Sequence, residues 1–226
     1  MALNWTTTNR ASEQGVKMLV YGKSGMGKTK LCATAPTPLI LSAEAGLLSL
    51  RAYDIPVLEI NTTGDLTEAY NWIRDSAEAK QFQTICLDSI SEIAEVVLAH
   101  AKKQVKDPRQ AYGELIEKMG ATIRLFRDLK GFNVYMSAKE AYEKDESGVM
   151  SYMPSMPGSK LGAGLPYYFD EVFHLSVGKT PEGVEYRYLR TQPDFNTIAK
   201  DRSGALDLIE AADLNNVITK ICQQTN

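Results

Sequence analysis

The sequence has 226 residues, of which 44% are hydrophobic, and this suits one large domain or at most two small ones with a sizeable core. Its 28 acidic and 25 basic residues leave a formal net charge of −3, so no chain-wide positive field points to nucleic acid, and such binding would need a local patch. The N-terminus is polar, and no apolar stretch approaches the roughly 18 residues that a membrane helix needs, so we expect a soluble protein without a membrane partner.

The first predicted elements follow a polar leader over residues 1–15. An apolar run at 16–21 is rich in strand formers, and the glycine-rich segment GKSGMGKT follows it directly, with helix-forming residues after that. Further buried strands are predicted over 38–44 and 55–60, with a small apolar helix between them. The chain therefore opens as strand, loop and helix, followed by two more strands.

Helices and strands continue to alternate through the middle of the chain. The spacing of apolar residues predicts a helix over 64–80, and a strand core follows at 84–87. Two helices are expected within 91–130, broken near Asp107, before another strand at 132–137. This alternation is typical of a parallel sheet with helical crossovers.

The last third of the sequence is less regular. Residues 138–164 mix charged, aromatic, proline and glycine residues without periodicity, which predicts a long functional or mobile loop. Two late strands at 170–177 and 185–190 are joined by a hairpin-type turn, and one or two short helices are expected after Gly204. We therefore predict a single α/β domain over 16–226, with a mostly parallel central sheet, helices on both faces and a short antiparallel edge.

Three cysteines are widely separated in the sequence. Cys32, Cys86 and Cys222 form no CxxC pair and have no histidine close by, which argues against a disulfide framework and against a zinc site. We expect them to be small buried residues of a protein in the reducing cytoplasm.

The segment GKSGMGKT matches the phosphate-loop pattern G-x-x-x-x-G-K-[ST], with the required strand before it and helix after it. Glycines allow the backbone N–H groups to wrap a β-phosphate, and the helix N-terminus adds further donors. Lys28 is expected to reach the β- and γ-phosphates, and the Thr29 hydroxyl to ligate Mg²⁺. The residues expected to hold ATP here are Gly22, Lys23, Ser24, Gly25, Met26, Gly27, Lys28 and Thr29.

Two carboxylates are candidates for the chemistry. Asp88 ends the predicted strand TICLD, where it would hold the metal, although it could also simply start the next helix. Glu44 closes the strand after the phosphate loop, and parallel strands bring their carboxyl ends to one edge, so it is the candidate base, with a plain surface role as the alternative. Many related hydrolases place a Glu directly after the metal-linked Asp, but Ser89 stands there, and with Glu92 it spells a capping box.

These motifs together resemble the RecA-type recombinase core, with a phosphate loop, a strand ending in Ala43-Glu44 and a strand ending in Asp88-Ser89. More narrowly, the start YGKSGMGKT, the strand MSAKE and the late segment IAKDRSG are similar to phage nucleotide-binding ATPases, which are RecA-core single-strand annealing proteins. The resemblance covers residues 16–204. It implies a RecA-like P-loop fold and Mg²⁺-dependent ATP hydrolysis coupled to single-stranded DNA binding and annealing. A homo-oligomeric filament or ring, a single-stranded-DNA-binding protein as partner and a bacterial host cytoplasm follow from the same likeness.

The resemblance also implies residue roles by position. Ser137, with Lys139, would sense the γ-phosphate at the end of the strand beside the phosphate loop. Lys200 and Arg202 would act catalytically on a neighbouring protomer's ATP, a role that Arg190 could also take, and a solvated charge cluster is the alternative. The segment after Ser137 would contact DNA, or else act as a nucleotide lid or partner-docking loop, and its candidate DNA-binding residues are Lys139, Tyr142, Lys144, Tyr152 and Lys160.

Other classes of protein share the phosphate loop. A small-molecule kinase usually has an arginine-rich lid, and residues 138–164 contain no arginine. A mechanical ATPase of the AAA+ type, acting on a protein partner, usually adds a helical lid domain, for which the stretch after Gly204 is short. A nucleotide-binding module without hydrolysis would not need Glu44. The leading prediction is therefore a DNA-stimulated ATPase.

Overall fold

The computed structural model describes residues 14–44, 46–144 and 147–223, so almost all of the predicted leader lies outside the described residues. Its strands are β1 (Lys17–Tyr21), β2 (Pro38–Ser42), β3 (Val57–Glu59), β4 (Thr84–Asp88), β5 (Asn133–Lys144), β6 (Met150–Ser155), β7 (Glu171–Lys179), β8 (Glu185–Arg190), β9 (Lys200–Asp201) and β10 (Ile209–Ala211). Its α-helices are α1 (Lys28–Leu31), α2 (Thr63–Asp75), α3 (Ile90–Gln104), α4 (Pro108–Arg127), α5 (Ser159–Gly164) and α6 (Leu214–Gln223). Four 3₁₀ turns accompany them, at Cys32–Thr34, Leu47–Leu50, Glu78–Gln81 and Leu165–Tyr168.

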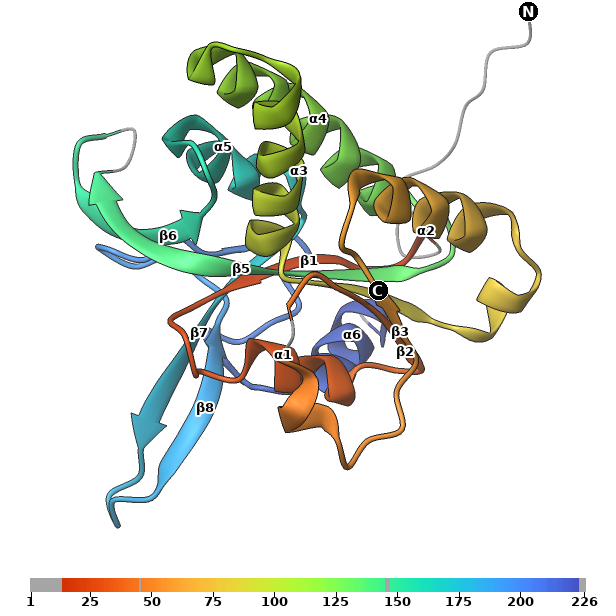
Figure 1. Cartoon of the computed structure of the whole chain (residues 1–226). Coiled ribbons are helices and arrows are strands. Elements are labelled where there is room, and N and C mark those ends of the chain that lie inside the picture. The colour runs from red at the N-terminus through yellow and green to blue at the C-terminus, as the bar shows by residue number, and fades with distance from the viewer. Residues whose placement is uncertain (1–13, 45, 145–146, 224–226) are drawn as a thin grey trace, which may run out of the picture.

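A ten-stranded sheet forms the centre, in the order β10-β8-β7-β1-β5-β4-β2-β3, with β6 paired to β5 and β9 paired to β7. The strands from β7 to β3 along this path are parallel to one another, whereas β8, β10, β9 and β6 pair antiparallel. Helices α2, α3 and α4 cover one face, and α1 and α6 cover the other (Figure 1). The predicted α/β class, a mostly parallel central sheet flanked by helices with a short antiparallel edge, is confirmed.

The central strands are buried along their whole length because helices cover both faces of the sheet. Successive side chains of a strand point to opposite faces, and β1 shows this clearly. Leu19 and Tyr21 belong to the core under α2, α3 and α4, whereas Met18 and Val20 belong to the core on the α1 and α6 side. The apolar run that the sequence shows at 16–21 therefore supplies both cores at once.

Polar residues mark the starts of the long helices. Thr62 and Asp65 form a reciprocal capping box at α2, and Asp107 caps α4, whose first residue is Pro108. The predicted break between α3 and α4 near Asp107 is confirmed. None of the described helices is both long and apolar enough to cross a membrane.

The predicted long loop over 138–164 is wrong. Strand β5 continues to Lys144 and pairs antiparallel with β6, and α5 follows, so the segment is a β-ribbon and a short helix beside the main sheet (Figure 1). The ribbon leaves the main sheet, and its outer part is largely exposed, so its strands carry charged and polar residues instead of an apolar run. Because this composition has no hydrophobic periodicity, the sequence does not predict the outer part of the strand.

Ser91, in the first turn of α3, fixes the place where β5 leaves the main sheet. Its hydroxyl donates to the carbonyl oxygen of Ser155 at 2.7 Å and accepts from the backbone N–H of Lys139 at 2.9 Å. The hydroxyl therefore holds both strands of the ribbon where the ribbon begins.

Candidate active site

The phosphate loop lies between the end of β1 and the start of α1. Gly25 and Gly27 have φ angles of 78° and 98°, in the left-handed region that favours glycine. A Cβ atom at Gly22 would lie 2.8 Å from the carbonyl oxygen of Leu175 in β7, which is too close for any side chain. The loop conformation therefore requires these glycines, and its first residue is packed tightly against β7.

The Lys28 ammonium group lies inside this loop. It donates to the carbonyl oxygens of Gly22 at 2.7 Å and Lys23 at 2.9 Å. Burial lowers the pKa of Lys28, and the nearby carboxylates of Asp88 and Glu44 oppose that shift. Both acceptors are neutral carbonyls, so a phosphate group would be a stronger partner for the amine.

A cavity of about 960 Å³ opens between the phosphate loop and the carboxyl edge of the sheet, which is a size typical of a small-molecule site. Gly22 and Met26 belong to the loop but do not line the cavity. Ser137, also predicted to contact the nucleotide, does not line it either. The remaining predicted nucleotide and metal residues do, together with the predicted base and one predicted DNA residue: Lys23, Ser24, Gly25, Gly27, Lys28, Thr29, Asp88, Glu44 and Lys139.

Asp88 is the most unusual group in this cavity. It is only 2% exposed, and one carboxylate oxygen, Oδ1, accepts a very short hydrogen bond from the Ser137 hydroxyl. The other oxygen, Oδ2, is buried and has no hydrogen-bond partner among the described residues. Such an orphaned acceptor is costly, and a bound cation would satisfy it.

The donor set fits Mg²⁺. Thr29 lines the same cavity as Asp88, and a hydroxyl plus one carboxylate is the sparse oxygen set with which proteins hold Mg²⁺ beside phosphates. Within the described ranges, no group of three or more histidine, cysteine or acidic side chains could hold a metal on its own. A divalent cation here would therefore depend on phosphate oxygens and water for the rest of its ligands.

Glu44 lies at the same edge because its strand is the neighbour of β4, with Ser42 in register with Asp88. The Ser89 hydroxyl donates to Glu44 Oε1 at 2.8 Å, and the Ser42 hydroxyl donates to the Glu44 backbone oxygen at 2.9 Å. The residue that stands in place of the usual glutamate after Asp88 thus orients Glu44 instead. The sequence did not reveal this link.

The predicted capping box at α3 is only half formed. Ser89 caps the helix by accepting from the Glu92 backbone N–H at 3.3 Å. The Glu92 carboxylate forms an ion pair with Lys139 across the cavity, and this contact raises the pKa of Lys139. Lys139 is exposed, but its ammonium group is therefore engaged by a carboxylate at the cavity wall.

Several lining residues are not predicted by the sequence, and two of them, Arg187 and Glu140, make side-chain contacts at the cavity. Arg187 of β8 donates through Nε to the carbonyl oxygen of Met26 at 2.7 Å. Glu140 of β5 lines the cavity, and its Oε2 lies 2.7 Å from His174 Nε2. Arg187 belongs to no motif, and Glu140 ends the segment MSAKE, but only the pairing of distant strands brings them to the loop.

The ring of Tyr152 lies between two other rings on the ribbon side of the site. Its centroid is 4.6 Å from that of Tyr142 and 5.7 Å from that of His174, and Lys23 from the phosphate loop lies over it. Tyr142 is half exposed, and Lys144 and Lys160 are exposed. The predicted DNA residues thus divide into an accessible set and a set engaged within the protein.

Lys200 and Arg202 lie apart from the cavity. Lys200 is opposite Val172 at the amino end of β7, whereas the phosphate loop follows the carboxyl end of β1. Lys200 donates to the carbonyl oxygen of Pro166 at 2.6 Å, and Arg202 pairs with Asp170 at 2.7 Å. Neither side chain lines its own chain's cavity.

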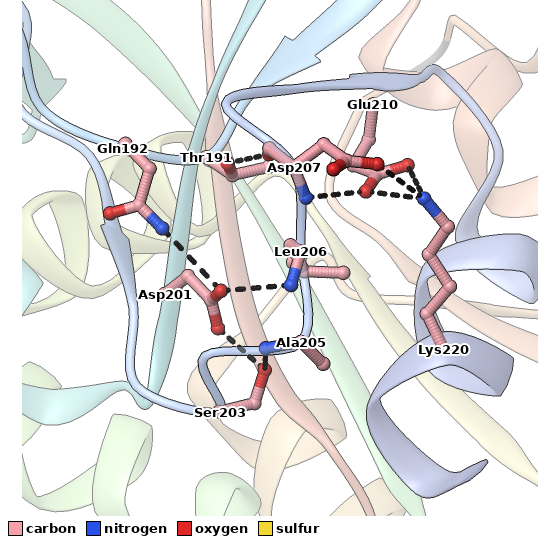
Figure 2. Close-up of polar contacts among 9 residues, drawn as sticks. All are labelled: Thr191, Gln192, Asp201, Ser203, Ala205, Leu206, Asp207, Glu210 and Lys220. Carbon is pink, nitrogen blue, oxygen red and sulfur yellow. Dashed lines mark hydrogen bonds and ion pairs between the residues drawn. The ribbon is translucent and has the colours of Figure 1, made fainter. Parts of the chain in front are cut away.

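Hydrogen bonds and an ion pair hold the segment that follows this pair against its own chain. Asp201 accepts from the Ser203 hydroxyl and the Leu206 backbone N–H, and Lys220 of α6 binds both carboxylate oxygens of Glu210 (Figure 2). A role of Lys200 and Arg202 at another protomer's nucleotide remains a prediction.

Comparison with known proteins gives a family and a distant structural likeness. A family model described as "AAA domain" matches residues 14–203. No curated protein sequence matches the chain. Solved structures that match include a KaiC-like protein, PH0186, from the hyperthermophilic archaea Pyrococcus horikoshii OT3, with 16% identity, a TM-score of 0.43, and coverage of 78% of this chain and 77% of that one.

Proposed function

Because the chain belongs to the AAA-domain family of P-loop ATPases, we propose that it hydrolyses ATP with Mg²⁺ and couples this to binding and annealing single-stranded DNA. The observation that carries the ATPase part is the buried Oδ2 of Asp88, which has no hydrogen-bond partner in the described ranges and belongs to the same cavity as Lys28 and Thr29. A carboxylate in that state suits a cation brought in with the nucleotide.

Four residues of the site have an assigned role in this proposed reaction. Lys28 exchanges its two carbonyl partners for phosphate oxygens, and Thr29 with Asp88 would hold Mg²⁺, which neutralises charge on the phosphates. Glu44, oriented by Ser89, accepts the proton of the water that attacks the γ-phosphorus. The bond from the γ-phosphorus to the bridging oxygen then breaks, giving phosphate and ADP.

The DNA part of the proposal is supported by the two faces of the β5–β6 ribbon. Along a strand, alternate residues share a face, so Tyr142 and Lys144 lie on one face and Glu143 lies on the other. Glu140 shares the face of Tyr142, but its carboxylate is buried against His174. Of the described acidic residues of β5, Glu143 therefore faces away from Tyr142 and Lys144, and the Glu140 carboxylate is buried.

Steady-state ATP turnover with and without single-stranded DNA tests both parts. We expect Mg²⁺-dependent turnover that DNA stimulates, that vanishes in Lys28→Ala, and that collapses in Glu44→Gln although nucleotide binding survives. If turnover is indifferent to DNA, the DNA assignment is wrong and the ATPase remains. Acceleration by a protein partner would then favour the AAA+ alternative. If the protein neither binds nor hydrolyses ATP, the whole proposal fails.

The oligomer and the partner protein are part of the same proposal. We propose a homo-oligomer on DNA, in which Lys200 and Arg202 act on a neighbour's nucleotide, and a single-stranded-DNA-binding protein as partner. Lys200 and Arg202 are displaced from their own chain's cavity, so any action on a nucleotide would have to be in another protomer.

A further inference from the structure

Arg187 reaches the phosphate loop from the opposite end of the sequence. Its Nε donates to the Met26 carbonyl oxygen, which lies 161 residues earlier in the chain, and the side chain lines the cavity with Lys28 and Thr29. Strands β7 and β8 run on as a two-stranded ribbon away from the rest of the sheet, and Arg187 is opposite Val177 within it (Figure 1). The position of the arginine is therefore set by a paired strand and not by a loose loop.

The loop is built around this side chain. A Cβ atom at Gly27 would lie 3.2 Å from Arg187 Nε, so a residue other than glycine would press against the guanidinium group as well as strain the backbone. Gly22 is packed against Leu175 of the adjacent strand in the same way. The root of the β7–β8 ribbon thus forms one wall of the phosphate site.

The charge of Arg187 has no partner of opposite charge within the described part of the chain. Lys139, another cation of the cavity, is paired with Glu92, whereas no carboxylate among the described residues pairs with Arg187. Toward the described residues it uses Nε alone, with a neutral carbonyl, so the N–H groups of its two terminal nitrogens can donate to an acceptor in the cavity. A guanidinium group presents these donors as a planar fork that fits phosphate oxygens.

We propose that Arg187 is a nucleotide-binding residue whose guanidinium group binds the phosphate chain of a nucleoside di- or triphosphate in the cavity of its own chain. The proposal rests on the proposed function, because it requires a nucleotide in this cavity. Lys28 then approaches the phosphates from within the loop, and Arg187 approaches them from β8.

Binding of fluorescently labelled ADP and of a non-hydrolysable ATP analogue, measured with Mg²⁺, tests the proposal in a set of variants. Arg187→Ala removes the side chain, Arg187→Gln keeps an N–H donor for Met26 but removes the charge, and Arg187→Lys keeps the charge but removes the fork. Lys179→Ala is the matched control, because Lys179 lies on the same ribbon, pairs with exposed Glu185 and does not line the cavity.

We expect Arg187→Ala and Arg187→Gln to weaken both ligands by about tenfold to a hundredfold, the usual effect of losing a charged hydrogen bond. Arg187→Lys should recover part of the loss, and Lys179→Ala should bind like the parent. The loss should shrink at high salt, because screening weakens charge interactions.

Several outcomes would overturn this assignment. If Arg187→Gln binds like the parent, the arginine only braces the loop through Met26, and if Arg187→Ala does so, the side chain has no part in binding. A parent protein that binds no nucleotide would defeat the proposed function itself, whereas a parent that binds well beside an equally good Arg187→Ala defeats only the role of Arg187. Thermal melting without nucleotide separates these results from misfolding.

Discussion

At the scale of single residues, the Asp88 carboxylate suits the proposed metal binding but is expected to lower the thermal stability of the protein. Its Oδ2 is buried and has no hydrogen-bond partner among the described residues, so one acceptor of the carboxylate is unsatisfied by the protein there. A buried carboxylate with an unsatisfied oxygen destabilises a fold more than a neutral polar group of the same shape does. The arrangement is reasonable only if a cation occupies the site during function.

We therefore expect Asp88→Asn to melt at a higher temperature than the parent without nucleotide, because the buried charge is gone and the amide oxygen can still accept from Ser137. Turnover should fall by about 10²-fold or more, the usual effect of losing one electrostatic contact at a transition state. The extra thermal stability that Mg²⁺ with nucleotide gives the parent should be lost. Scanning calorimetry with and without ligands measures this, and a lower melting temperature of the free variant would contradict it.

At the scale of elements, strand β5 of the β5–β6 ribbon places Tyr142 and Lys144 on one face and Glu143 on the other. We expect Tyr142→Ala to weaken single-stranded DNA binding by about tenfold, because stacking contributes about 1–3 kcal/mol per base. Lys144→Ala should reduce the dependence of the affinity on salt by about one phosphate contact. Fluorescence anisotropy over a range of salt concentrations measures both effects.

Glu143→Gln is the control for these two variants, because it changes charge at the neighbouring position on the other face. We expect it to bind DNA about as well as the parent. All three variants should keep their nucleotide affinity. Equal losses in Glu143→Gln and Tyr142→Ala would mean that the faces are not distinct.

The junction of β7 and β9 predicts a pH dependence of stability. Glu171 is 2% exposed and is in register with Asp201, and burial, reinforced by the Asp201 carboxylate, raises its pKa from 4.5 to about 8. Between these two values the folded state keeps a proton that the unfolded state has lost. The free energy of unfolding should therefore be highest, from this group, below pH 4.5, and should fall as pH rises toward 8, by at most about 1.4 kcal/mol per unit.

Glu171→Gln imitates the protonated group and should remove this slope. We expect the variant and the parent to unfold at similar urea concentrations at pH 4.5, and the variant to be the more stable at pH 8. The exposed variant Glu185→Gln should follow the parent at every pH. A parent whose stability does not fall between these pH values would refute the burial of a protonated Glu171.

At the scale of the whole molecule, the position of Lys200 and Arg202 predicts complementation between damaged copies. Lys28→Ala has a damaged phosphate site, and the double variant Lys200→Ala, Arg202→Ala has an intact one. If the basic pair acts across an interface, mixing these two inactive proteins on DNA should restore part of the ATP turnover. The mixture of Lys28→Ala with Glu44→Gln is the control, since every site in it is damaged, and activity no higher than the sum of the separate proteins in both mixtures would contradict the prediction.

The sequence predicts the central part of this molecule well because its signals there are local. A glycine-rich loop of this pattern between an apolar strand and a helix adopts few structures other than a phosphate loop. Neighbouring parallel strands bring their carboxyl ends, and with them Glu44 and Asp88, to one edge of the sheet. Ser137 falls beside Asp88 for the same reason, because β5 lies between β1 and β4.

The residues that the sequence did not predict come from longer-range pairing. Arg187 reaches the loop only because β8 pairs antiparallel with β7. No local sequence pattern predicts which residues of β7 and β8 lie opposite each other. The β5–β6 ribbon was mistaken for a loop because its exposed strands lack an apolar period. Lys200 and Arg202 look like a motif in sequence, but the pairing of β9 with the start of β7 places them away from the cavity.

Strand β5 belongs both to the main sheet and to the ribbon, without a break at Ser137 or Lys139. From Ser137 to Lys144 it advances by about 3.3 Å per residue, or about 23 Å in all. Ser91 of α3 holds it two residues after Ser137 by accepting from the Lys139 N–H, and the same hydroxyl donates to the Ser155 carbonyl oxygen of β6. The short part of the strand before Lys139 contacts Asp88 through Ser137, and the longer part after Lys139 carries Tyr142. With the strand held at Lys139, a small tilt beside Asp88 would displace the Tyr142 end by a larger distance.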